Sequence, residues 1–271
     1  MSEQYNLNGG LLVMGSLCWE HTGIRSAWRQ EALAMAHKIS VPLPIRYGRI
    51  STTRYNTYTM VYSMDLPENH RGTGYVVPFR QNPFRSPSDI LTAAETVIRV
   101  ERNLSTEGWK QVRSRDAVSF DWHWGALGLA INPRLRQRED DRQYFSEQLR
   151  REWRGSFSAG FRASRYQLPG ETAAFITGDG TLRFRWPPGV DDLDFVMGTV
   201  IRPSRDEAQP GYPSARTIAE AMYRVNCYNY FLSNYRCGIT TFQDDEILRL
   251  IRDQYNLCNY LQKELGVSVS D

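Results

Sequence analysis

The sequence lacks several features that would identify a class of protein at once. Its apolar runs are all far shorter than the ~20 residues that a membrane-spanning helix needs. Its polar start, MSEQYNLN, does not resemble a signal peptide. Its 4 cysteines show no C-x-x-C spacing, so neither a zinc ribbon nor a redox pair is indicated. We therefore expect a cytoplasmic protein with free thiols and no membrane partner.

Common nucleotide-binding, nucleophilic and metal motifs are also missing. The segment Gly72–Gly74 has no third glycine and precedes a predicted strand, which argues against a dinucleotide site. There is no G-x-S-x-G sequence for a serine nucleophile. Cys18, His21 and His37 are scattered and have no fourth partner. We therefore expect neither a metal nor a cofactor.

The sequence does contain ample material for a globular core. Of the 271 residues, 41% are hydrophobic and 12% aromatic, which argues against disorder. The 33 lysines and arginines nearly balance the 30 aspartates and glutamates, and a net charge of +3 is too mild to indicate nucleic-acid binding. RNA binding through Arg46, Arg49 and Arg54 would require a contiguous basic face. Nucleic acid is therefore not the expected partner.

The order of the predicted elements favours an α+β fold of one or two domains. Helices are expected over residues 23–36, 89–102, 139–157, 214–235 and 242–265, and strands over residues 11–14, 58–63, 75–79, 109–118, 122–131 and 195–201. The prolines between residues 39 and 57 indicate a loop. Because strands and helices do not alternate regularly, a doubly wound parallel sheet is not expected.

The first predicted strand, Leu11 to Met14, runs directly into the pair Gly15-Ser16. Such a pair favours a tight turn that exposes backbone N–H groups. The turn either only redirects the chain, with Ser16 capping the next segment, or it holds a carboxylate or phosphate through those N–H groups. The residues of the turn alone leave both interpretations open.

Glu95 is a candidate for acid–base chemistry. It lies in LTAAETVI, among apolar neighbours of the helix predicted for residues 89–102. A carboxylate in such surroundings has a raised pKa and suits proton transfer if it faces a cavity, whereas the alternative is an ordinary exposed glutamate. Glu101 is the competing base, six residues later on the same helix. The two side chains point about 120° apart, so only one can face a given pocket.

Together these segments resemble the gamma-glutamylcyclotransferase-like family, in particular its glutathione-degrading branch. In that family the first strand runs into a Y-G-S-L motif, followed by a tryptophan two residues on. The matching residues in MGSLCW are Gly15, Ser16, Leu17 and Trp19. Met14 stands in place of the tyrosine and removes a hydroxyl that could bind substrate. A G-V-A-Y-like strand then precedes the helix with the catalytic glutamate, and here GTGYVVPF precedes SPSDILTAAETVI, which matches Glu95 to that glutamate.

The resemblance covers residues 10–135 and implies a fold. Residues 1–135 would form a small, mostly antiparallel β-barrel or strongly curved sheet. Residues 136–271 would be a C-terminal extension of further strands and helices that packs on this core or completes it. The expected architecture is therefore α+β, with the Glu95 helix at the mouth of the barrel.

The resemblance also implies an activity. Enzymes of this family cyclise a γ-glutamyl group to 5-oxoproline and release an amine or amino acid. The substrate-binding residues would be Gly15, Ser16, Leu17 and Trp19, with the backbone N–H groups of the turn on the substrate's carboxylate. Glu95 would take a proton from the substrate's α-amine, which then attacks the γ-carbonyl.

A noncatalytic cyclotransferase-like module is the alternative, because Met14 and the long C-terminal half depart from the family pattern. Such a module would bind a small ligand or a protein, or form an oligomer, with its C-terminal helices as the interface. The position of Glu95 separates the two hypotheses. In an enzyme, the base lies in the same cavity as the N–H groups of Gly15 to Leu17.

Overall fold

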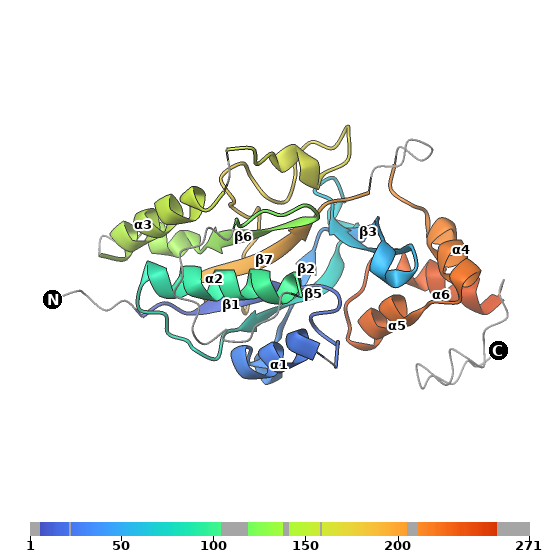
Figure 1. Cartoon of the computed structure of the whole chain (residues 1–271), viewed down its shortest axis with the longest axis horizontal. Helices are drawn as coiled ribbons and strands as arrows, with labels where there is room; N and C mark the ends of the chain where they lie inside the picture. Colours follow the sequence, from blue (N-terminus) through green and yellow to red (C-terminus); the bar gives the residue numbers. More distant parts are fainter. Residues whose placement is uncertain are drawn as a thin grey trace.

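The computed structural model describes residues 6–21, 23–103, 119–137, 141–157, 159–204 and 211–253. Within these ranges, a five-stranded sheet, a two-stranded hairpin and six α-helices form an α+β fold (Figure 1). The predicted α+β class is therefore confirmed. None of the described helices has the length and apolar character needed to cross a bilayer.

The sheet is mixed, with the strand order β2-β5-β1-β7-β6. Its central strand, β1 (Gly9–Val13), is antiparallel to β5 (Gly72–Pro78) and parallel to β7 (Phe195–Ile201). At the edges, β2 (Ile39–Leu43) pairs with β5 and β6 (Gly125–Ile131) pairs with β7, both antiparallel. Because β2 and β6 do not pair with each other, these strands form an open sheet and not the closed barrel that was one of the two expected forms.

Both halves of the chain contribute to this sheet. The register of β1 against β7 runs from Gly9 opposite Phe195 to Leu12 opposite Gly198. The Phe195 ring occupies the space that a side chain on Gly9 would need. Residues from the expected extension therefore lie beside the first strand, inside the main sheet.

A separate hairpin, β3 (Ile45–Ser51) and β4 (Thr57–Tyr62), occupies most of the region for which a loop was expected. The loop prediction for residues 39–57 was wrong, because prolines do not always break regular structure. Pro42 lies on β2, at the edge of the sheet, where a missing N–H removes no interior ladder bond.

The hairpin contains a β-bulge at Gly48. Tyr47 pairs with Met60, and the next pair is Arg49 with Thr59, so Gly48 has no partner of its own. A Cβ atom at Gly48 would lie 2.7 Å from the ring of Tyr212. The bulge therefore changes which face of the hairpin the side chains after Gly48 occupy, beginning with Arg49. It also leaves room for the ring of Tyr212 from the C-terminal half.

Helix α2 (Pro87–Glu101) follows β5 and runs along the sheet in Figure 1. Ser86 caps it, because its hydroxyl oxygen accepts a hydrogen bond from the Asp89 N–H at 3.2 Å. Its core-facing residues include Ile90, Ala94 and Val97, which are fully buried. The helix contacts both α1 (Gly23–Ala32) and α3 (Asp141–Gly155). Its C-terminal end lies near the end of β1, because Glu101 and Val13 line the same pocket.

Three C-terminal helices lie beside the hairpin, at the right of Figure 1: α4 (Ala215–Val225), α5 (Asn229–Arg236) and α6 (Asp244–Asp253). The single helix expected over residues 214–235 is broken at Asn226, which adopts the left-handed conformation with φ of 49°. The break lets α5 turn back toward the hairpin. The strand expected at 109–118 and the helix end beyond residue 253 lie outside the described residues.

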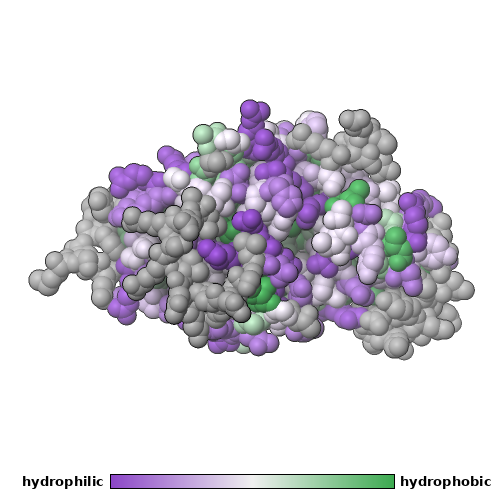
Figure 2. Space-filling view, viewed as in Figure 1, coloured by the Kyte–Doolittle hydropathy of each residue, from purple (hydrophilic) through white to green (hydrophobic). Residues whose placement is uncertain are grey.

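The surface is mainly polar. On the face shown in Figure 2, hydrophilic residues predominate among the coloured atoms, and strongly apolar ones appear only as small separate areas. Large exposed hydrophobic side chains of the described residues are Tyr55, Tyr223, Val225 and Phe242. The best-defined structural feature for function is therefore a pocket and not an apolar surface.

Candidate functional site

The turn after β1 exposes three backbone donors. Gly15 has a φ of 92°, in the left-handed region that favours glycine. The next residues curl into a single turn in which Cys18 N–H donates to Gly15 O at 3.0 Å and Glu20 N–H donates to Ser16 O at 2.9 Å. The N–H groups of Gly15, Ser16 and Leu17 donate no hydrogen bond to any residue that the structure describes. The turn thus has the donors that an anion requires.

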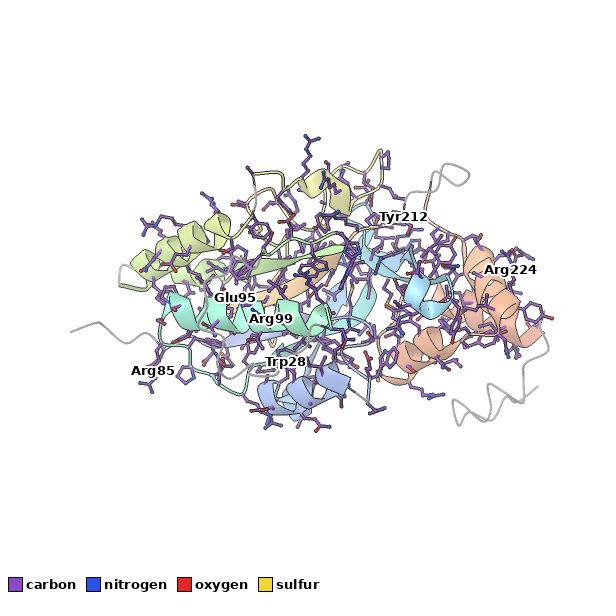
Figure 3. All side chains as sticks on the ribbon, viewed as in Figure 1. Trp28, Arg85, Glu95, Arg99, Tyr212 and Arg224 are labelled. Carbon is purple, nitrogen blue, oxygen red and sulfur yellow. The ribbon has the colours of Figure 1, made fainter. Side chains whose placement is uncertain are left out.

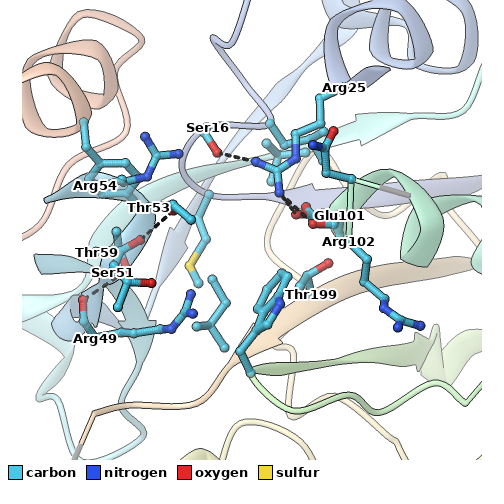
Figure 4. A pocket seen from close by; sticks show the side chains of 18 of the residues that line it. Ser16, Arg25, Arg49, Ser51, Thr53, Arg54, Thr59, Glu101, Arg102 and Thr199 are labelled. Atoms are coloured by element: carbon cyan, nitrogen blue, oxygen red, sulfur yellow. Dashed lines mark hydrogen bonds and ion pairs between the residues drawn. The ribbon is translucent and has the colours of Figure 1, made fainter. Parts of the chain in front are cut away.

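A pocket of about 320 Å³ opens against this turn. The end of β1, the turn, the β3–β4 hairpin, the C-terminal end of α2 and Tyr230 of α5 all contribute to its walls (Figure 4). Its volume lies at the lower end of the ~300–1,000 Å³ typical of small-molecule sites. The arginines and carboxylates among its lining residues are Arg25, Arg49, Arg54, Arg102 and Glu101. Positive charge therefore predominates, and the pocket suits an anionic small molecule.

Arg25, on α1, connects the turn to the end of α2. Its Nη1 donates to Ser16 Oγ and to Glu20 Oε2, both at 3.2 Å. Its Nη2 donates to the backbone oxygen of Glu101 at 2.7 Å and lies 3.3 Å from Glu101 Oε2. One guanidinium thus fixes the position of the Glu101 carboxyl relative to the Gly15–Leu17 turn.

The Glu101 side chain is 14% exposed and lines the pocket. Burial raises the pKa of its carboxyl, Arg25 lowers it in part, and the nearby Glu20 raises it further. A carboxyl with a raised pKa in a pocket is suited to take and return a proton. Glu101 is therefore the candidate base of this pocket.

Glu95 lies elsewhere on α2 (Figure 3). Burial raises the pKa of its half-buried carboxyl, and the neighbouring Arg99 lowers it in part. Ser16, Leu17 and Glu101 line the pocket, but Glu95 does not. The structure therefore brings the competing candidate, and not Glu95, together with the turn. The side chains of Glu95 and Glu101 point about 120° apart around the helix, which explains why only Glu101 reaches the pocket.

Trp19 supports the pocket from behind. Its Nε1 donates to Asn234 Oδ1 at 2.7 Å, and its ring meets the edge of Tyr230 with centroids 6.1 Å apart. Tyr230 lines the pocket, and its hydroxyl oxygen accepts a hydrogen bond from Met60 N–H at 3.3 Å. A Cβ on Gly15 would lie 2.8 Å from that oxygen. Trp19 thus positions α5 against the turn and is not itself part of the pocket wall.

Arg49 and Arg54 line the pocket on the hairpin side, whereas the sequence suggested them only as possible RNA contacts. The Arg49 guanidinium lies 5.2 Å from the ring centre of Trp124. The Arg54 guanidinium lies 4.8 Å from the ring centre of Tyr230 and 5.5 Å from that of Trp19. The sequence has no signal for this arrangement, because the aromatic partners come from three distant segments.

The scattered cysteine and histidines that could be metal ligands do not assemble into a site. Cys18 is buried, and burial together with the nearby Cys237 raises the pKa of its thiol to about 11. Among the described residues, no group of three or more His, Cys, Asp or Glu side chains is arranged to hold a metal ion. The chemistry of the pocket is therefore considered from its arginines, hydroxyls and carboxyl.

The pocket combines backbone donors that no described residue pairs with, a partly buried carboxyl held by an arginine, and two further guanidinium groups on the hairpin wall. These groups are sufficient to bind an anion and to exchange a proton with it. Among protein-family models, curated proteins and solved structures the chain has no match, so the role of the pocket is inferred from its own residues.

Proposed function

We propose that the chain is a gamma-glutamylcyclotransferase-like enzyme that forms 5-oxoproline from a γ-glutamyl compound, with Glu101 as its general base. The observation that carries the proposal is that Glu101 lines the same pocket as Ser16 and Leu17, whose backbone N–H groups donate to no residue that the structure describes; Gly15 begins the turn but does not line the pocket. The resemblance of MGSLCW and of the following strand and helix to that family adds support. Glu95, the glutamate that the resemblance matches, does not line this pocket, so the expected arrangement of an enzyme is met only if Glu101, six residues later on α2, is the base.

The turn would hold one end of the substrate. Three N–H groups at the end of a strand are suited to the α-carboxylate of a γ-glutamyl group. This carboxylate would place the α-amine on the side of Glu101, because Arg25 ties that residue to Ser16. Holding the glutamyl chain bent brings its nitrogen toward the γ-carbonyl and removes much of the entropic barrier to ring closure.

The reaction then needs one proton carrier. Glu101 takes a proton from the α-ammonium group, and the freed nitrogen attacks the γ-carbonyl carbon to form the new C–N bond. The bond from that carbon to the leaving nitrogen breaks. The leaving nitrogen receives the proton from Glu101 and also the second proton that the attacking nitrogen loses as it becomes the lactam N–H. The products are 5-oxoproline and a free amine, with no change in oxidation state.

Replacing each glutamate by glutamine tests the assignment. We expect Glu101→Gln to lower the rate of 5-oxoproline release from γ-glutamyl substrates by ~10²–10⁴-fold, because glutamine cannot accept the proton. Ligand affinity should stay within a few-fold, because glutamine keeps the size of the side chain. Glu95→Gln is the matched control on the same helix and should keep its activity. The assay measures 5-oxoproline from a panel of γ-glutamyl compounds.

Two results would count against the proposal. An active Glu101→Gln protein would exclude this residue as the base, and loss of activity only in Glu95→Gln would restore the first candidate. Binding of γ-glutamyl compounds without any 5-oxoproline would instead support the noncatalytic binding module.

A further inference from the structure

The hairpin wall of the pocket carries two cations that have no counter-ion among the described residues. Arg49 and Arg54 line the pocket from β3 and from the segment after it, and Figure 4 shows both on the wall that faces Arg25 and Glu101. No carboxylate of the described residues pairs with either guanidinium. Arg25, in contrast, is neutralised by Glu20 and Glu101. The unbalanced charge of the pocket is therefore concentrated on the hairpin side.

These two guanidinium groups are held in place by aromatic rings. Arg49 packs on Trp124, and Arg54 packs on Trp19 and Tyr230. Arg49 is partly buried, and its pKa is lowered by burial and by the positive charge of Arg54. Two like charges that are partly removed from water and close enough to affect each other cost free energy until an anion joins them. Such an arrangement is typical of a binding site and does not help the fold.

Hydroxyl groups lie between the two arginines. Ser51 and Thr53 are hydrogen-bonded to each other at 3.1 Å and both line the pocket. Only one of them can donate in that bond, so the other O–H remains available for a ligand. Two guanidinium forks and a hydroxyl donor together suit an anion with several acceptor oxygens.

We propose that Arg49 and Arg54, with the Ser51–Thr53 hydroxyl pair, form a subsite for the phosphate monoester group of a small-molecule ligand. A phosphate monoester carries a charge of about −1.5 to −2 at neutral pH and three terminal oxygens, which balances two arginines, whereas a carboxylate balances one. If the proposed function is correct, the phosphate group is carried by the amine that the reaction releases from the γ-glutamyl compound; this part of the inference rests on the proposed function. The ligand then has an acidic group at each end, one on the turn and one on the hairpin.

A matched set of ligands tests the subsite. Binding of γ-glutamyl-phosphoethanolamine, γ-glutamylethanolamine and γ-glutamyl-β-alanine is measured by calorimetry on the Glu101→Gln protein, so that turnover does not interfere. We expect the phosphorylated compound to bind at least about tenfold more tightly than either of the others. Equal affinities of all three, or equal affinities of the phosphate and carboxylate compounds, would overturn the proposal.

Arginine variants locate the effect. Arg49→Gln and Arg54→Gln should each remove most of the preference for phosphate, and Arg49→Lys should keep part of it, because lysine retains the charge but not the fork. Arg46→Gln is the matched control: Arg46 also lies on β3 and packs on aromatic rings, those of Tyr212 and Phe242, but does not line the pocket. A phosphate preference that survives both Gln substitutions, or is lost equally in Arg46→Gln, would place the subsite elsewhere.

A measurement on the unaltered protein keeps the test independent of folding and of the reaction. O-phosphoethanolamine should bind, and ethanolamine and acetate should not bind at the same concentrations. If it binds through Arg49 and no γ-glutamyl compound is bound or cyclised, the proposed function fails and the subsite stands. If phosphorylated and neutral γ-glutamyl compounds are bound and cyclised equally well, the function stands and the subsite fails.

Discussion

A single residue, Arg25, determines how the two parts of the candidate site meet. Its guanidinium contacts Ser16, Glu20 and Glu101, which lie on the turn and at the end of α2. Its side chain is only 18% exposed, so these charge-assisted contacts are poorly screened by water. Loss of Arg25 would leave the Glu101 carboxyl partly buried without a cation, which disfavours its ionised form.

The pH dependence of stability reports on this pair without any enzymatic assay. Burial raises the pKa of Glu101 in the folded protein above its unfolded value. The folded protein then binds the Glu101 proton more tightly than the unfolded protein does. The stability that this protonation adds is therefore complete below the unfolded pKa, near 4.5. This contribution is lost as the pH rises through the folded pKa. We expect the difference in the free energy of unfolding between the unaltered protein and Glu101→Gln to fall as the pH rises above about 4.5, as measured by urea titrations at several pH values.

Arg25→Gln provides the matched comparison. Because the arginine lowers the pKa of Glu101, its removal should raise that pKa further and extend the fall in stability to higher pH. A constant difference between the unaltered protein and Glu101→Gln at every pH would contradict the assignment. A fall in stability over the same pH range with and without Arg25 would show that Arg25 has no effect on the titration of Glu101.

At the scale of elements, α5 connects the pocket to both the hairpin and the first turn. It supplies Tyr230, whose ring lies beside Arg54 and whose hydroxyl reaches the hairpin at Met60, next to the bulge. The same helix carries Asn234, which accepts the hydrogen bond of Trp19. A short helix from the C-terminal half therefore joins the hairpin to the first turn.

Tyr230→Phe tests this connection. The substitution keeps the ring but removes the acceptor of the buried Met60 N–H, and leaving such a group unpaired costs about 1–3 kcal/mol. We expect a loss of stability of this size in denaturant unfolding. Tyr235→Phe, on the same helix and only partly buried, is the control and should change stability by less than ~0.5 kcal/mol. Equal effects of the two substitutions would mean that the Tyr230 hydroxyl does not stabilise the hairpin.

The elements also show what a sequence can and cannot predict. Helix α2 is predicted well, because Ser86 caps it and its apolar residues follow the helical period. The strand expected over residues 58–63 matches β4, but β2 and β3 are missed, because prolines are loop signals in general although Pro42 lies on an edge strand. The break between α4 and α5 is missed, because Asn226, not glycine, takes the left-handed conformation.

The candidate site is predicted only in part. The Gly15–Leu17 turn can be predicted because strand, glycine and serine are consecutive in sequence. The choice between Glu95 and Glu101 depends on which side of α2 packs against the end of β1, and helical spacing alone does not determine that. The roles of Arg49 and Arg54 depend on aromatic rings from distant segments, so no local pattern could reveal them.

At the scale of the whole molecule, the sheet depends on both halves of the chain. β6 pairs within the sheet only with β7, and β7 also covers one edge of β1. Residues 1–135 alone would therefore leave β1 with an unpaired edge and β6 without a partner. The core would also lose Phe195 and Val196, which are fully buried.

A truncated chain tests this dependence. We expect residues 1–135 alone to show no cooperative unfolding transition in denaturant, whereas the complete chain should unfold cooperatively. Circular dichroism during the titration measures both. A cooperative transition of the truncated chain would show that the first 135 residues form an independent domain and that β7 is an addition to it.

The pairing of β1 with β7 also has a consequence during synthesis. The Asn8 N–H donates to Asp194 Oδ2 at 2.7 Å across 186 residues, so the first strand cannot complete its pairing until most of the chain has been made. At ~5–20 residues per second, one edge of β1 waits for about 10 to 40 s after leaving the ribosome. Contacts between residues this far apart in sequence also slow the refolding of the purified full-length protein. The nascent protein therefore needs protection of an apolar strand edge before its pocket can exist.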